Sequence, residues 1–167
     1  MAKKPEKGGA EEKPKEEEKP FENTPSELDD LTHHELRLMF DRSAEAVLFA
    51  KNIQWRSVGS SLIVMAVFIA LVMFGTPSEA LANILGVATI VLAGGVIFVL
   101  TLYQSWQYNE ISRIVELEKH FSTLYRKIRD VKSRREGNFH RYTLLLFMAG
   151  VEITGAGVTL YVINQVL

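Results

Sequence analysis

The chain has 167 residues, which is enough for one modest domain. Its formal net charge of -1 provides no overall basic surface, so we expect no nucleic-acid partner. Because the sequence contains no cysteine, disulfides, thiolate metal sites and a cysteine nucleophile are excluded. Long apolar runs alternate with charged segments, and this arrangement indicates a membrane protein.

The chain begins with a segment that has almost nothing to bury. Residues 1–24 are dominated by Lys, Glu, Pro and Gly, and we expect a disordered tail there. No apolar stretch follows the first lysines, so the segment is not a secretory signal. Thr24 and Thr32 each begin a Thr-x-x-Glu sequence, which is the spacing of a helix capping box. We therefore expect a cytoplasmic helix, assigned to residues 25–56, that begins near Thr24 or near Thr32 and continues into the first apolar run.

Three apolar runs cover residues 57–75, 77–103 and 142–165. Each is near the ~20 residues that a helix needs to cross about 30 Å of hydrocarbon. A soluble protein would need a core larger than this chain can build to bury them. The sequence therefore predicts an all-α membrane protein with three transmembrane helices.

The first connector is very short. Gly75 is expected to end the first span in the left-handed conformation. Thr76 is expected to cap the next helix, with Pro77 at its first position and Glu79 completing a capping box.

The distribution of Lys and Arg predicts the orientation of the chain. These residues lie before the first span and between the second and third spans, and neither the first connector nor the C-terminal end contains any. We expect a protein of the plasma membrane, specifically the bacterial inner membrane, with a cytoplasmic N-terminus and an external C-terminus. Trp55 and Trp106 fall at the cytoplasmic boundary, where aromatic side chains anchor helices.

Residues 104–136 are predicted to form a cytoplasmic, coiled-coil-like helix that ends at Gly137 and Asn138. Its apolar residues follow three-four spacing and form a predicted oligomer seam: Ile114, Leu117, Phe121, Leu124, Ile128 and Val131. A complementary stripe precedes the first span: Leu36, Met39, Ser43, Ala46, Ala50 and Ile53. A continuous helix over residues 104–136 would be about 50 Å long. The extended chain from residue 137 to residue 142 spans at most about 20 Å, so it could not reach the membrane from the far end of a helix that points straight away from the bilayer. The segment therefore lies along the membrane or bends near residues 120–123, and we favour a bend that packs on the first cytoplasmic helix.

A basic cluster in the same segment is expected to lie near anionic lipid headgroups. Its members are Arg126, Lys127, Arg129, Lys132, Arg134 and Arg135. The alternative is that these residues act only as the positive-inside signal.

Glu152 lies in the middle of the third apolar run, and such a residue usually faces a bundle interior or a cavity. Counting from Arg141 places it about 16 Å deep, level with Gly94 and Gly95 of the second run. We expect it to point toward these glycines. As a protonated group it would bind Thr89 or a backbone carbonyl. Alternatively, several copies of Glu152 would line a pore.

No catalytic motif is present. The chain contains no G-x-S-x-G, H-E-x-x-H or nucleotide-binding fingerprint. His33 and His34 are adjacent, so on a helix they point about 100° apart and do not share a metal easily. We expect no enzymatic activity, no cofactor and no metal.

The sequence "LFAKNIQWRS" at residues 48–57 leads into a tight two-helix hairpin, which a long helix follows. This arrangement resembles the SLATT group of small bacterial membrane proteins, which are predicted pore-forming effectors associated with nucleotide-signalling defence systems. The likeness covers about residues 36–136 and brings no catalytic residues. The third span, with Glu152, departs from the two-helix plan.

Two functions are compatible with these patterns. The first is an assembly or accessory subunit that forms a homo-oligomer, or joins a membrane complex, through its cytoplasmic helices and small-residue membrane faces. The second is an oligomeric ion- or proton-conducting pore, or membrane effector, in which Glu152 lines the path. Membrane lipids are expected partners in both.

Overall fold

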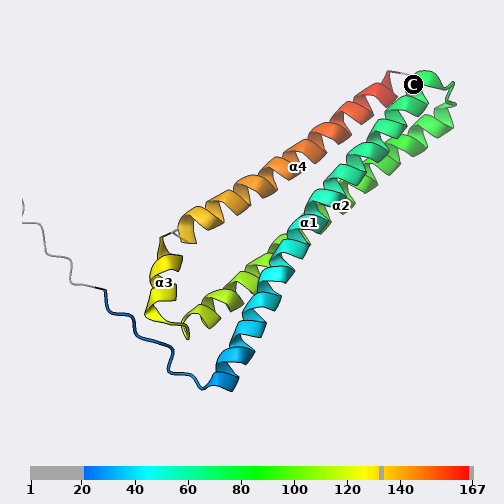
Figure 1. Cartoon of the computed structure of the whole chain (residues 1–167). Coiled ribbons are helices and arrows are strands. Elements are labelled where there is room, and N and C mark those ends of the chain that lie inside the picture. Colours follow the sequence, from blue (N-terminus) through cyan, green and yellow to red (C-terminus); the bar gives the residue numbers. More distant parts are fainter. Residues whose placement is uncertain (1–20, 132–133, 166–167) are drawn as a thin grey trace, which may run out of the picture.

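The computed structural model describes residues 21–131 and 134–165, and this part of the chain contains four helices and no strand (Figure 1). Helices α1 (Asp30–Phe74) and α2 (Glu79–Glu118) form a long antiparallel hairpin. The short helix α3 (Thr123–Asp130) leads from the far end of α2 to α4 (Arg134–Asn164), which packs along the hairpin. The all-α prediction is confirmed.

Helices α1, α2 and α4 are each long and apolar enough to cross a membrane. The three predicted spans coincide with these helices except for residues 75, 77, 78 and 165, which fall just outside them. Helix α4 begins at Arg134, eight residues before the predicted start of its span. We call the part of the bundle between the α1–α2 connector and Trp55 the apolar end. The hairpin beyond Trp55 and Trp106, together with α3 and residues 21–28, is the polar end.

The apolar end has a core in three layers. One layer joins Val58, Val96, Leu100 and Met148, the next joins Met65, Ala93 and Ala156, and the last joins Val72, Ala82, Leu85 and Ile163. Every layer contains residues from all three long helices. Large apolar side chains such as Phe74, Phe98 and Leu146 point outward, as the surface of a helical bundle in lipid requires.

The predicted details of the α1–α2 connector are wrong, although the connector is as short as expected. Gly75 is extended (φ -91°, ψ -178°), and Ser78 caps α2 in place of Thr76, so Pro77 precedes the helix. The Gly75 amide donates to the Leu71 carbonyl oxygen at 3.1 Å. A Cβ at Gly75 would lie 2.5 Å from that oxygen, so close approach explains this glycine.

The assignment of a helix from residue 25 is wrong, because α1 begins at Asp30, close to the alternative start near Thr32. The Asp29 carboxylate caps it by accepting from the amides of Leu31 and Thr32 at 3.1 and 3.0 Å. The Thr32 hydroxyl also donates to Asp29 at 2.7 Å, and the hydrogen bonds from Thr32 lower the pKa of this carboxyl. Residues 21–28 are not helical, and residues 1–20 of the predicted tail lie outside the described part.

The predicted single helix over residues 104–136 is wrong, whereas the favoured bend is confirmed. Helix α2 ends at Glu118, and Ser122 caps α3 by accepting from the Tyr125 amide at 3.3 Å. Gly137 and Asn138 do not end a helix, because they lie inside α4.

The bend also divides the predicted seam. Leu117 is buried, and the Phe121 ring contacts Phe40 of α1, whereas Ile128 on α3 and Val131 just after α3 are exposed. The six seam residues therefore do not form one continuous stripe.

Candidate functional site

Glu152 belongs to α4 and lies at the centre of the apolar end, on the side of α4 that packs against the hairpin. Its side chain is fully buried, and its Oε1 accepts a hydrogen bond of 2.6 Å from the Ser61 hydroxyl of α1. Its Oε2 has no hydrogen-bond partner in the described part of the chain. This contact joins two helices of one protomer inside its own bundle.

The prediction that Glu152 faces Gly94 and Gly95 is wrong. No atom lies within 4 Å of a Cβ built at either glycine, and both are exposed. Thr89 is fully buried, but its hydroxyl donates to the Leu85 carbonyl of its own helix at 2.8 Å. The predicted depth agrees with the packing, because Glu152 lies midway between Met148, which packs with Val96 and Leu100, and Ala156, which packs with Ala93. The error concerns direction, because both glycines lie on the exposed side of α2.

Gly155 explains why α4 approaches α1 so closely at this level. A Cβ at Gly155 would lie 2.7 Å from Leu62 Cδ2 and 3.3 Å from Met65 Sδ, both on α1. Small residues permit such close contact between helices in lipid. The close approach brings Ser61 within hydrogen-bonding distance of Glu152.

A second buried polar contact joins α1 to α2 near the boundary between the two ends. The Gln54 side chain donates to the Leu100 carbonyl at 2.9 Å, and Gln107 donates to the Gln54 Oε1 at 2.8 Å. Both glutamines are almost completely buried. Sequence analysis missed them, although each lies beside a boundary tryptophan, Trp55 or Trp106, and in three-four spacing with core residues.

The buried polar residues continue into the polar end. Glu110 accepts from the Arg113 guanidinium at 3.0 and 3.2 Å and from the Trp106 indole at 3.3 Å. Ser43 is also buried, and its Oγ has no partner in the described part of the chain. The hairpin therefore contains polar groups from the level of Glu152 to that of Ser43.

An ion pair and an aromatic cluster hold the corner between α2 and α3. The buried Glu118 accepts from Arg129 Nε at 2.8 Å and from the Tyr125 hydroxyl at 3.5 Å. Ring centroids of Phe121 lie 5.9 Å from Phe40 and 5.0 Å from Tyr125. Burial raises the pKa of the Tyr125 phenol, and the neighbouring Glu118 carboxylate adds to this rise.

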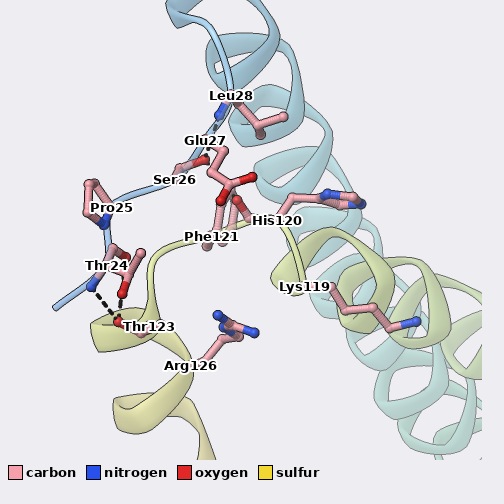
Figure 2. Close-up of a pocket in the computed structure, with 10 residues that line it drawn as sticks. All are labelled: Thr24, Pro25, Ser26, Glu27, Leu28, Lys119, His120, Phe121, Thr123 and Arg126. Carbon is pink, nitrogen blue, oxygen red and sulfur yellow. Dashed lines mark hydrogen bonds between the residues drawn. The ribbon is translucent and has the colours of Figure 1, made fainter. Parts of the chain in front are cut away.

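Residues 21–28 form an extended N-terminal segment that binds this corner (Figure 2). The Thr24 amide donates to the Thr123 hydroxyl at 2.8 Å, and the Thr123 amide donates to the Thr24 carbonyl at 3.1 Å. Asn23 Oδ1 accepts from the Leu124 amide at 3.2 Å, and the Ser26 hydroxyl donates to the His120 carbonyl at 2.9 Å. The segment thus binds two first-turn amides of α3, which otherwise have no intrahelical partner.

A polar pocket of about 320 Å³ lies between the N-terminal segment and the corner, with Glu27, Lys119 and Arg126 among its lining residues (Figure 2). Glu27 of the N-terminal segment lines the pocket together with the cations of the corner, and Lys119 is bound to Glu116 at 2.6 Å, so the lining is not uniformly positive (Figure 2). We assign no ligand to it.

The predicted lipid-binding cluster is divided among different surroundings. Arg129 is occupied by Glu118, and Lys127 lies 4.3 Å from the centre of the Phe21 ring. Arg126 is exposed beside the polar pocket. Lys132 and the side chains of Arg134 and Arg135 lie outside the described part.

Comparison of the chain with family models, curated proteins and solved structures gives no match.

Proposed function

We propose that this protein is a non-enzymatic membrane protein whose copies assemble in the bilayer and present the polar end to the cytoplasm. The observation that carries the proposal is the continuity of α1 and α2, which run from the apolar end into the polar end without interruption. The buried hydrogen bonds from Gln54 to the Leu100 carbonyl and from Gln107 to Gln54 fix the two helices to each other along this path. When copies of the chain associate in the membrane, the continuous helices therefore set the distance between their polar ends.

The orientation rests on the distribution of positive charge. The polar end contains basic residues of α1, α2 and α3, whereas the α1–α2 connector contains none. The positive-inside rule then assigns the polar end to the cytoplasm of the plasma membrane. A bacterial inner membrane is the expected location.

Exposed apolar side chains at the polar end support an assembly role. Leu38 and Met39 on α1 are 54% and 47% exposed, and Ile128 on α3 is 65% exposed. These residues lie outside the apolar runs, where lipid does not cover them. Contiguous apolar surface in water marks sites of protein interaction.

The test is the mass of the purified protein released from lipid nanodiscs into a native mass spectrometer. We expect masses that are multiples of the 18.8 kDa chain. A single species of one chain over the whole range of protein-to-lipid ratios would overturn the assembly proposal.

A pore is the second candidate, and the Glu152 Oε2 without a partner is the observation that favours it. The resemblance to SLATT proteins points in the same direction. Against this candidate, Glu152 is buried inside one protomer, so a pore between copies would need α4 to rotate. Proton and cation leak in proteoliposomes separates the two functions. A leak that disappears in Glu152→Gln supports the pore, and equally tight vesicles with both proteins support assembly alone.

A further inference from the structure

The α1–α2 hairpin has two long sides, and the rest of the chain covers only one of them. In the apolar end, α4 packs on α1 through Leu62 and Met65. In the polar end, the α2–α3 corner packs on the same side of α1 through Phe40. At 100° per residue, these α1 positions lie on one face of the helix.

The other side of the hairpin carries two open pockets, one in each end. The first, of about 260 Å³, is lined at the polar end by Met39, Ser43 and Ala46 together with Arg113 of α2. The second, of about 490 Å³, is lined at the apolar end by Ser57, Ser60 and Val64 together with Gly95 of α2. Both pockets lie about 120° around α1 from the covered face. We call this side the back groove.

The α1 residues of the back groove repeat with the spacing of a helix–helix seam. Between the two pockets the same steps of three and four continue through Ala50 and Ile53, which gives the series Met39, Ser43, Ala46, Ala50, Ile53, Ser57, Ser60 and Val64. Ala50 is fully buried and lines neither pocket, so the two pockets are separate openings along this line. Most of these side chains are small, so a second helix is able to approach the backbone of α1 closely.

Two further observations indicate that the groove is occupied. The Ser43 Oγ is buried at 2% exposure, has no partner in the described part of the chain and belongs to the lining of the polar-end pocket. Beside it, Leu38 and Met39 are about half exposed, although they lie beyond the apolar runs. Buried polar groups normally have a partner, and apolar patches normally have a cover.

The length of the groove limits what its occupant can be. The line through both pockets, from Leu38 to Val64, extends about 39 Å along α1 at 1.5 Å per residue. An acyl chain covers only the apolar end, and a soluble helix covers only the polar end. The occupant must be a helix that enters the bilayer and continues well beyond it, and α1 itself is such a helix.

We propose that the back groove binds the same face of α1 from a second copy of this chain, giving a twofold dimer. All copies insert with one orientation, so the twofold axis lies along the membrane normal and the two α1 helices run parallel. The same small residues then face each other along the whole contact. This inference rests on the proposed assembly function and names its interface.

Disulfide cross-linking in native membranes tests the interface directly, because the chain has no cysteine of its own. Ala46→Cys and Ser60→Cys place thiols two heptads apart on the back groove. Leu48→Cys and Ile63→Cys are matched controls at similar depths, and both native side chains are 68% exposed away from the groove. Disulfides form when the two Cα atoms lie within about 7 Å. We expect diamide to convert the first two variants to covalent dimers and to leave the controls monomeric.

Failure of the interface is distinguishable from failure of assembly. Multimeric masses combined with cross-links only at residues 48 or 63, or with none, would overturn the back groove and leave assembly standing. A monomeric mass would overturn both. As a second variant, Ala46→Trp fills the groove outside the apolar end, and we expect it to weaken dimerisation at least tenfold with unchanged helical circular dichroism. Leu48→Trp is its control, and equal dimerisation of the two tryptophan variants would contradict the proposal.

Discussion

The two ends of the hairpin are closed in different ways. In the apolar end a full-length helix, α4, covers α1 and α2 and contributes to all three core layers. In the polar end the same side is closed by an eight-residue helix and an extended segment, which depend on individual hydrogen bonds, one ion pair and an aromatic cluster. We infer that the apolar end sets the stability of the molecule, whereas the polar end opens locally at a lower cost in free energy.

The largest effect is expected from Gly155→Leu, which forces α4 away from α1. The added side chain meets Leu62 and Met65 in a space where even a Cβ is crowded. We expect a loss of about 3 kcal/mol in the free energy of unfolding, at the upper end of overpacking effects. Denaturation in mixed micelles measures it. Gly157→Leu is the matched control, because nothing lies within 4 Å of a Cβ there, and an equal loss in both variants would contradict the account.

Ser61→Ala tests the polar contact inside the apolar end. It removes the hydrogen bond to Glu152 and leaves both carboxyl oxygens without a partner. We expect a loss of about 1 kcal/mol, because interhelical hydrogen bonds in membranes contribute about 0.6 to 1.7 kcal/mol. Ser60→Ala, measured by the same denaturation, should change little, since the Ser60 hydroxyl donates to carbonyls of its own helix.

Glu118→Gln tests the polar end alone. The variant loses the charge-assisted bond to Arg129, so α3 should separate from α2 more often while the apolar end is unchanged. Hydrogen exchange of the α3 amides should accelerate about fivefold, which corresponds to about 1 kcal/mol. Glu116→Gln removes an exposed pair on the same turn and should leave this exchange rate as it is.

Alkaline pH should open the same corner. The folded structure favours the neutral phenol of Tyr125, so its contribution to stability is complete below the ordinary tyrosine pKa of about 10 and is lost as the pH rises through the raised pKa. The difference between the ultraviolet titrations of wild type and Tyr125→Phe isolates this phenol. A midpoint at or below about 10 would contradict its burial at the corner.

The smallest effect is expected from Thr123→Val, which removes the hydroxyl that binds the Thr24 amide. Cleavage by chymotrypsin after Phe21 or Leu28 should become about threefold faster, with no change in the unfolding of the bundle. Thr101→Val provides the comparison, because the Thr101 hydroxyl binds only carbonyls of its own helix.

The same contrast explains what the sequence could predict. Apolar runs predict the three spans, and chain reach favours the bend near residues 120–123 over a helix that lies along the membrane, because both depend on local composition and on length. The docking of Thr24 on Thr123 and the partner of Glu152 depend on contacts between distant segments. The Asp29 cap, by contrast, is made by the neighbouring amides of Leu31 and Thr32 and was within reach of the sequence. The Thr-x-x-Glu pattern at Thr24 was misleading because the Thr24 backbone binds another helix. The error at Glu152 concerns direction and not depth, because counting from Arg141 gives the level along the bundle but not which faces of α1 and α2 turn toward α4.

The most direct test of the central claim is energy transfer between donor- and acceptor-labelled wild-type chains in liposomes as lipid is added. A dimer predicts transfer that stays above the value for random mixing and then falls along a two-state binding curve at high dilution. Transfer equal to random mixing at every protein-to-lipid ratio would show that the hairpin works as a single copy, and would contradict the account.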